Sequence, residues 1–406
     1  MKGLQGSSLG IGAQIRDVQS RLISADFITP PSAPARLLLF IFYVATVIFG
    51  RNLFVNQVGQ LYIAELMYVP LFLLSLVRLR AVDLLVLVAL LIFVGFGTYR
   101  HGSFFWAVKD SMMFWYMPLA TIAFVSVSSQ DLVRIWSLSL AFSCLTFLLR
   151  GFRIMEVSGL EMNQYNLAAL YLLVIILGLQ LRKWSRLGIT LFILASVVTA
   201  TFKTYFAGLL LLALLLRFRE SIRRYFGLPV VLLISLGVLA LATDAGAEYL
   251  MRNYVDALNS VAGFFYPDKQ FNTTTVAWRS VLWGNVVTQN LEAGWAAIIF
   301  GSLPGRNILA DSGFLREGIG LDPRSSHNIF VDLFGYFGIT GLIVWCAALM
   351  WRTAKSDYAR VYLLIMILFS MTNTLFTRVS SCLLAYFAIG VIIRADVYSR
   401  VDRRVQ

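Results

Sequence analysis

The residues best suited to chemistry stand where a polar segment of the sequence meets a long apolar run. His327 and Asn328 begin this run, and Gly335, Gly338 and Gly341 follow at three-residue spacing. If the run is a helix, the glycines leave one flank without side chains, so another helix can approach closely. His327 is expected to cap the helix at its positive end, where the helix dipole disfavours imidazolium. A neutral imidazole beside water accepts protons, which makes His327 the candidate general base.

Several cations interrupt or flank apolar runs elsewhere in the chain, and we expect them at membrane depth. These cations are Arg100, Lys109, Lys203, Arg279 and Arg378. Cations at that depth are costly and usually have a partner. Because nearby carboxylates are too few to neutralise all of them, an anionic ligand is the natural alternative. A guanidinium fork in particular suits a phosphate or a diphosphate.

Each of these residues also has a purely structural interpretation. A histidine at a helix start is more often a cap or an interface residue than a base. Arg279 could simply pair with Asp268 or Glu292. The side chains of Arg100, Lys109, Lys203 and Arg378 could extend to lipid headgroups. We favour this interpretation for Arg100 and Lys109.

Two further features of this part of the sequence have structural rather than chemical explanations. Asp332 lies inside the apolar run and is expected to pair with another polar group of the helix bundle, on a different helix face from His327. The stretch from Gly301 to Gly305 contains the turn signal Pro-Gly, and we interpret it as a tight turn rather than a phosphate cradle.

Composition places these residues in a helical membrane protein. Of the 406 residues, 59% are hydrophobic and only 14% are charged, and the mean hydropathy is +0.77, far outside the range of soluble domains. The charges cluster between continuous apolar runs about as long as a bilayer is thick, about 17–25 residues. The net charge of +13 would suit nucleic acid, but the cations lie at helix ends, so no nucleic-acid partner is expected.

The cysteines and the first residues of the chain add two negative expectations. All three cysteines fall inside apolar runs, so neither a disulfide framework nor a cysteine-based metal site is expected. The first 35 residues contain no compact signal-peptide core, so we expect the first membrane helix to be retained. No metal or other cofactor is predicted.

The apolar runs predict an all-α integral membrane protein with about 12 transmembrane helices and one large periplasmic loop. The expected spans lie near residues 37–50, 60–77, 81–99, 104–126, 133–149, 164–181, 187–201, 205–216, 226–242, 327–350, 358–375 and 381–394. The expected organisation is a cytoplasmic tail (1–35), nine membrane helices (36–242), the large loop (243–326), three membrane helices (327–394) and a cytoplasmic tail (395–406).

The distribution of Lys and Arg predicts the orientation of the chain. Of the 34 cationic residues, 21 fall on the side that holds both termini, and outside the long loop only 7 fall on the other side. Both termini are therefore expected in the cytoplasm, and the large loop and His327 on the opposite, periplasmic side. Within residues 243–326 we expect two or three short helices lying over the membrane helices.

Taken together, the candidate residues favour one reaction class. They offer one base and several cations on the same side, without a metal-ligand cluster or a pair of catalytic carboxylates. This set suits transfer from a phosphate-activated lipid donor. The diphosphate leaving group of such a donor needs charge stabilisation, and the acceptor hydroxyl needs a base.

At these residues the sequence resembles the superfamily of O-antigen ligases and O-antigen polymerases, which are bacterial membrane glycosyltransferases. The resemblance covers about residues 160–350 and is carried by five pieces. They are the Ser-His-Asn start with its glycine-spaced helix (326–341), Arg279 followed four residues on by Trp283, Phe300 to Gly305, Gly159 to Ala169 with Asn163 and Asn166, and Thr201 to Thr204, where many relatives have Ser-Arg.

The resemblance implies a GT-C-like enzyme that works without metal in the bacterial inner membrane, with its active site on the periplasmic side. Such an enzyme transfers a glycan from an undecaprenyl diphosphate donor to a sugar hydroxyl. By motif, His327 activates the acceptor and Arg279 binds the donor diphosphate. Lys203 keeps the charge of the family's arginine but lacks its bidentate fork. With Asn328, Arg100 and Arg378, the last from topology alone, it completes the expected substrate-binding set.

Polymerase and ligase differ only in the acceptor, which is a growing lipid-linked glycan in O-antigen or exopolysaccharide assembly, or the lipid A-core of lipopolysaccharide. The sequence slightly favours a polymerase, because it contains no dedicated basic surface for lipid A-core. The alternative from another class is a transporter or flippase of a lipid-linked anionic substrate. That alternative predicts inverted repeats, broken midplane helices and deep charges, which the sequence does not indicate. A membrane scaffold would not explain cations collected on one side.

Overall fold

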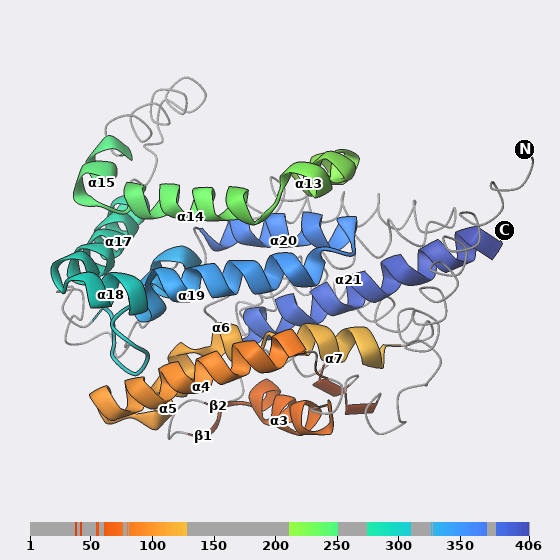
Figure 1. The fold of residues 1–406 in the computed structure, drawn as a ribbon, viewed down its shortest axis with the longest axis horizontal. Helices are drawn as coiled ribbons and strands as arrows, with labels where there is room; N and C mark the ends of the chain where they lie inside the picture. The colour runs from red at the N-terminus through yellow and green to blue at the C-terminus, as the bar shows by residue number, and fades with distance from the viewer. Residues whose placement is uncertain are drawn as a thin grey trace, which may run out of the picture.

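A computed structural model describes slightly more than half of the chain (Figure 1). The described residues are 37–38, 41–42, 54–56, 61–75, 79, 81–127, 211–250, 274–309, 326, 328–371 and 379–405. This part is almost entirely helical, with one short antiparallel pair of strands, β1 (Phe54–Asn56) and β2 (Leu61–Tyr62). The predicted all-α class therefore holds for the described residues apart from this ribbon, which the sequence did not indicate.

The first half of the described chain contains five helices. They are α3 (Ile63–Ser75), α4 (Ala81–His101), α5 (Phe104–Asp110), α6 (Met112–Trp115) and α7 (Pro118–Ser126). The predicted span over 104–126 is interrupted, because three short helices occupy it in place of one continuous helix; that it crosses the membrane stays a prediction. Ser111 separates the first two and bonds back to the Ala107 carbonyl (2.6 Å), and Pro118, which has no N–H, starts the third.

The second half contains a helical stretch at 211–217, within the predicted span at 205–216, and eight helices with defined bounds. They are α13 (Arg219–Tyr225), α14 (Leu228–Leu241), α15 (Asp244–Leu250), α17 (Thr274–Glu292), α18 (Trp295–Phe300), α19 (Ile329–Thr353), α20 (Asp357–Ser370) and α21 (Val379–Val405). Four of them, α14, α19, α20 and α21, overlap predicted spans. The predicted spans at 133–149, 164–181 and 187–201 lie outside the described residues.

Some of these helices are apolar enough for a membrane protein. Residues Asp83–His101 of α4 and the whole of α19 are long and apolar enough to cross a membrane. A third candidate combines α13 and α14, which are bent by 82° at the break between them. The total of twelve spans and the periplasmic loop stay predictions.

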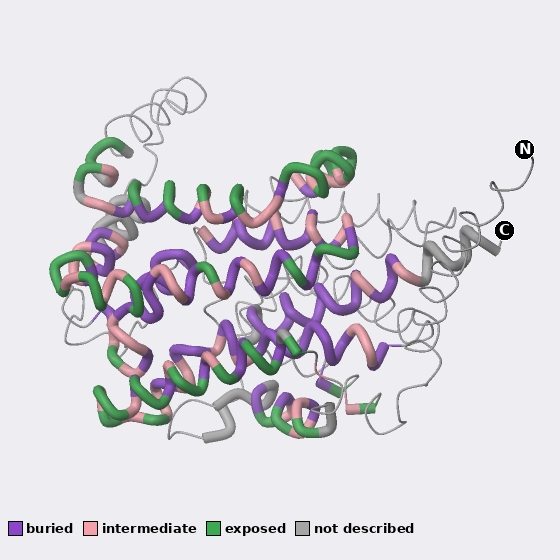
Figure 2. Tube along the Cα trace, viewed as in Figure 1, coloured by how far each residue is buried: buried purple, intermediate pink, exposed green. Residues whose placement is uncertain are grey.

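The centre of the described part is formed by α7, α19, α20 and α21, which are buried over most of their length (Figure 2). Helices α7 and α21 approach closely at Gly390, which has no side chain. A Cβ at this position would lie 2.2 Å from the Ala120 carbonyl oxygen. In contrast, α4 and α14 expose apolar side chains such as Leu85 (67%) and Leu233 (71%). Such exposed apolar faces are suited to lipid.

Polar groups in the bundle are joined by ion pairs between distant parts of the sequence. The carboxylate of Asp83, at the start of α4, binds the guanidinium of Arg352, at the end of α19. Thr121 of α7 donates to Asp83 Oδ2 and accepts from Arg352 Nη1, both at 2.9 Å. All three residues are buried, so the pair is held inside the bundle.

The helices divide the described part into two ends, which Figure 1 shows on the left and right. At the α17–α18 end, α15, α17 and α18 lie near the start of α19 and the end of α4. At the α13 end, α13 lies beside the start of α20, near the end of α19. The described residues of 243–326 thus contain three helices, although α17 is longer than the short helices that we expected.

Candidate functional site

The start of α19 confirms a helix beginning at the Ser-His-Asn element but changes its cap. Asn328 is the N-cap, and its side-chain oxygen accepts the backbone N–H groups of Phe330 (3.0 Å) and Val331 (3.4 Å). The expectation that His327 caps the helix is therefore wrong. Asparagine is among the best N-cap residues because its short side chain reaches the free amides of the first turn. His327 itself lies outside the described residues.

The peptide groups of Ser326 are held by two buried or half-buried side chains. Asp332 Oδ1 accepts the Ser326 N–H at 2.7 Å, and Trp283 Nε1 of α17 donates to the Ser326 carbonyl at 2.8 Å. The Ser326 hydroxyl also donates to the Asn328 carbonyl at 3.2 Å. Asp332 thus has the polar partner that we expected, although this partner is a backbone amide. The chain on both sides of residue 327 is fixed.

Asn328 retains one uncommitted donor beside this segment. Its side chain is fully buried, and Nδ2 makes no hydrogen bond to a described residue. A buried amide donor without an acceptor is costly. The expected role of Asn328 in substrate binding is compatible with this geometry, since the free donor lies next to the candidate base in sequence.

The structure describes the other predicted cations to different extents. Arg279 belongs to α17 and lies one turn before Trp283, so the two positions share a helix face. The side chain of Arg279 lies outside the described residues, as do Lys203 and Arg378. The backbone therefore places Arg279 on the helix whose Trp283 binds Ser326. The contacts of the Arg279 side chain are not described.

The glycine-spaced run of α19 is interrupted rather than continuous. Gly338 has φ +62° and ψ −160°, a conformation that an L-residue rarely adopts, and it kinks the helix. A Cβ at Gly335 would lie 2.8 Å from a side-chain atom of α17, and one at Gly338 would lie 2.5 Å from the α18 backbone. Close approach of neighbouring helices is therefore confirmed at these two glycines. Gly341 instead faces Phe337 of its own helix.

Three carbonyl groups next to the kink find partners in α17 and in the turn that follows α18. Asn290 Nδ2 donates to the Gly335 carbonyl (3.2 Å) and to the carbonyl before it (2.8 Å). The backbone N–H of Ser302 donates to the Gly335 carbonyl (2.9 Å), and that of Leu303 donates to the Tyr336 carbonyl (3.1 Å). The kink is therefore stabilised by hydrogen bonds from outside α19.

The turn from Gly301 to Gly305 is confirmed as a tight turn. Gly301, Leu303 and Gly305 have φ of +74°, +69° and +107°. The turn is tied to α4 and α5, because His101 Nε2 lies 2.9 Å from the Ser302 carbonyl oxygen and the Gly305 N–H donates to a carboxylate oxygen of α5 at 2.9 Å. His101 is the other histidine of the chain, and the sequence analysis did not select it.

A small polar cavity of about 40 Å³ lies between the end of α4, α17 and this turn. Arg100 lines it from α4, and Arg306 lines it from the turn; both are exposed. The amides of Gln289 and Asn290 lie on its α17 side. A cavity of this volume holds a few water molecules, so a larger anion would contact the two arginines at its mouth. Sequence analysis selected Arg100 but missed Arg306.

Lys109 shows where the sequence argument about cations was wrong. Its ammonium group lies 2.6 Å from a carboxylate oxygen of Glu65 in α3, and the lysine side chain is only 12% exposed. Tyr116 donates to the same carboxylate at 2.5 Å. Lys109 therefore neither extends to headgroups nor awaits a ligand. Glu65 lies 44 residues away, so proximity in sequence could not reveal it.

The described residues contain no group of three or more His, Cys, Asp or Glu side chains that could hold a metal ion. Comparison of the chain with protein-family models, curated proteins and solved structures gives no match.

Proposed function

We propose that this protein is a membrane glycosyltransferase that moves a glycan from undecaprenyl diphosphate onto a sugar hydroxyl during O-antigen or exopolysaccharide assembly. It is a metal-independent enzyme of the O-antigen polymerase or ligase type. It acts on the periplasmic side of the bacterial inner membrane, with lipids around its bundle. The resemblance of the Ser-His-Asn element and of the Arg279–Trp283 pair to that superfamily is the starting point of the proposal.

The observation that carries the proposal is the hydrogen bond between Trp283 and Ser326. It joins α17, which contains Arg279, to the residue before His327. The two motif pieces of the family, 43 residues apart in sequence, thus meet at one point of the fold. Arg100 lines a cavity beside the later part of α17, at the same end of the described bundle, and this cation favours an anionic substrate there.

The proposed mechanism uses these groups in one displacement. His327 takes the proton of the acceptor hydroxyl while the hydroxyl oxygen attacks the anomeric carbon of the donor sugar. The bond from that carbon to the diphosphate breaks, and the diphosphate leaves with the electron pair. Arg279 and Lys203 stabilise the charge that develops on it, with Arg378 and Arg100 as further cations. Asn328 offers a buried donor beside the base.

The acceptor is the point at which a polymerase and a ligase separate. We retain the slight preference for a polymerase, whose acceptor is a lipid-linked glycan. A ligase would need an additional basic surface for lipid A-core.

A transporter of a lipid-linked anion is the second candidate, and the kink in α19 is the feature that bears on it. Broken membrane helices commonly offer their freed carbonyl groups to a substrate or an ion. Here the carbonyls of Gly335 and Tyr336 already accept hydrogen bonds from Asn290, Ser302 and Leu303. Because these carbonyls are already engaged, the kink serves the packing of α17 and α18 better than it serves a transport site, and we rank the transferase first.

The test is complementation of a strain that lacks this gene. Wild type, His327→Ala and Arg279→Ala are expressed at matched membrane abundance, and surface glycan is resolved by size on a gel. Arg252→Ala, which removes a charge from the same loop at a position without an assigned role, is the control. Wild type and the control give long chains, whereas neither site variant does.

The residual products identify the acceptor. Single repeat units attached to core indicate a polymerase, and free lipid-linked polymer indicates a ligase. Full-length surface glycan with both site variants would remove His327 and Arg279 from the mechanism. Loss of lipid-linked glycan from the outer leaflet, measured by its accessibility to an added glycosidase in spheroplasts, would move the assignment to the transporter.

A further inference from the structure

The α13 end carries a short basic helix that lies across the axis of the helix following it. Residues 217–224 contain four arginines and one glutamate, and α13 is bent by 82° from the apolar helix α14. If α14 crosses the membrane, α13 therefore lies along its surface. Phe218 lies within the basic stretch and Tyr225 follows it, and they are 53% and 68% exposed. Exposed aromatic rings next to cations are typical of the headgroup level of a bilayer.

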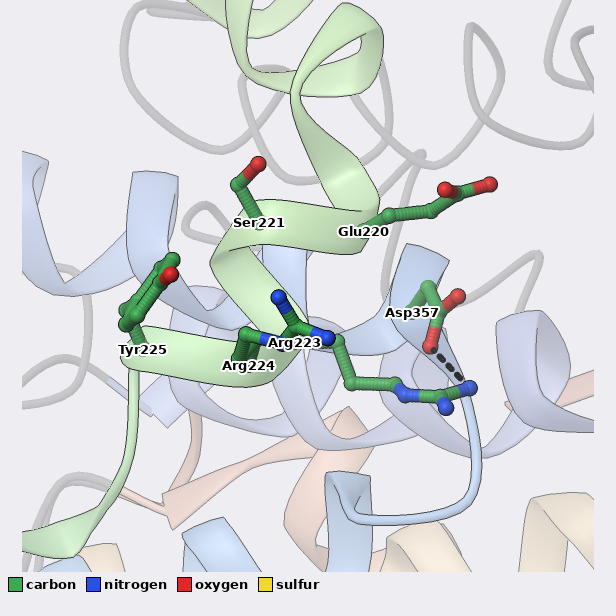
Figure 3. Close-up of a pocket in the computed structure, with 6 residues that line it drawn as sticks. All are labelled: Glu220, Ser221, Arg223, Arg224, Tyr225 and Asp357. Atoms are coloured by element: carbon green, nitrogen blue, oxygen red, sulfur yellow. Dashed lines mark hydrogen bonds and ion pairs between the residues drawn. The ribbon is translucent and has the colours of Figure 1, made fainter.

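A cleft of about 620 Å³ opens between α13 and the start of α20 (Figure 3). Its described lining residues all belong to these two helices: Glu220, Ser221, Arg223, Arg224, Tyr225 and Asp357. The cleft therefore combines two guanidinium groups, a hydroxyl and a phenol with two carboxylates. It lies at the opposite end of the described bundle from the Ser-His-Asn element.

The cations around this cleft differ in how far they are committed to other groups. Arg219 stacks over the Tyr358 ring at 5.5 Å, and Arg223 pairs with Asp357 at 3.4 Å, which is the dashed line in Figure 3. Arg360 donates to the Arg223 carbonyl and so holds α13 against α20. Arg224 is exposed, and no bond to another described residue is recorded for it.

We propose that this cleft binds the phosphate headgroup of an anionic phospholipid from the leaflet at the α13 end, with Arg224 as the main anion ligand. A clustered set of arginines beside an apolar helix attracts anionic lipid. A guanidinium also binds a phosphate through two parallel hydrogen bonds. Arg223 can share its exposed guanidinium between Asp357 and the phosphate. The inference rests on α14 crossing a membrane and is independent of the proposed glycosyl transfer.

The experiment measures binding of short-chain phosphatidylglycerol to the full chain in neutral detergent by thermophoresis. Arg224→Gln is compared with wild type and with Arg217→Gln. Arg217 is also exposed and lies on the same basic stretch, but it does not line the cleft. Arg224→Gln is expected to weaken binding about fivefold, the loss expected for one cation near a lipid surface. Arg217→Gln is expected to change it less than about twofold, since it keeps the cleft.

Equal losses from both variants would show that the basic stretch attracts lipid without a specific site, and this would overturn the proposal. Unchanged binding by Arg224→Gln would overturn it as well. Inorganic phosphate at matched ionic strength is the competitor. If phosphate alone binds with the affinity of the lipid, the cleft is a site for a soluble anion rather than for a headgroup. Far-ultraviolet circular dichroism and elution volume establish that each variant is folded.

Discussion

The described part of the molecule contains two kinds of polar network, which differ in the groups that they bind. Among the membrane helices, two charged networks join side chains to side chains: Asp83 with Arg352 and Thr121, and Glu65 with Lys109. At the α17–α18 end, side chains bind the backbone, including the peptide of Ser326, the kink of α19 and the turn at Gly301 to Gly305. The first kind neutralises charge among apolar helices, and the second stabilises an irregular backbone. The candidate site is therefore built on an irregular backbone that side chains hold in place.

Breaking a bundle pair is expected to give the largest loss of stability. Asp83→Ala leaves the Arg352 guanidinium, 6% exposed, without its carboxylate, and the free energy of unfolding should fall by about 3–5 kcal/mol. The measurement is unfolding in mixed micelles of increasing denaturing detergent. The double variant Asp83→Leu, Arg352→Met should recover at least half of the loss. A double variant as unstable as the single one would show that burial of charge is not the cause.

Disturbing the backbone network at its kink should cost slightly less. Gly338→Ala adds a Cβ 2.5 Å from the backbone at Ile299 and forces alanine into φ +62°, so we expect a loss of about 2–4 kcal/mol. Gly237→Ala is the matched control, because its Cβ enters open space in the middle of α14. It should stabilise the protein by about 0.5–1 kcal/mol. If Gly338→Ala and Gly237→Ala changed the free energy of unfolding equally, the kink would not be required for stability.

Removal of one amide from the same network is a milder test. Asn290→Ala leaves two carbonyl groups of the kink without this donor, and the expected loss is about 1–3 kcal/mol. Amide hydrogen exchange should accelerate in the residues that follow Gly335. Gln289→Ala, on the neighbouring position of α17, should change stability by less than about 0.5 kcal/mol. Unchanged exchange in Asn290→Ala would assign the kink's stability to Ser302 and Leu303 alone.

Two tryptophan substitutions are expected to have the smallest effect on stability but different effects on activity. Trp283→Phe and Trp345→Phe each remove one indole N–H bond, the first to the Ser326 carbonyl (2.8 Å) and the second to the Tyr386 hydroxyl inside the bundle (3.0 Å). Both should cost about 1 kcal/mol. Only Trp283→Phe should also reduce glycan transfer, by about tenfold, because it loosens the segment that contains His327. Equal transfer by both variants at matched abundance would contradict the proposed site.

Long apolar runs made α4, α14 and α19 predictable, since length and hydropathy alone indicate such helices. The helix start near Asn328 was also predictable from its polar residues. The split of 104–126 was not, because it depends on a serine hydroxyl bond and on a proline whose effect depends on its surroundings. The kink at Gly338 was hidden because the same glycine spacing also predicts close helix packing, and both occur.

The candidate site was predictable to a smaller extent. The Ser-His-Asn element and the position of Arg279 on a helix could be stated in advance, but the bond that joins them depends on Trp283, whose role in the sequence was only a motif match. Lys109 was misjudged because its carboxylate partner comes from α3. Arg306 was missed because it approaches Arg100 only through the folding of the turn.

The sequence separation of the Asp83–Arg352 pair has a consequence for how the protein is made. Thr121 follows Asp83 by 38 residues, whereas Arg352 follows it by 269. At a synthesis rate of about 5–20 residues per second, the arginine leaves the ribosome about 15–50 s after the aspartate. The threonine hydroxyl is thus the partner available early, and the arginine arrives when most of the chain has been inserted. Closure of this pair is therefore a late event of assembly.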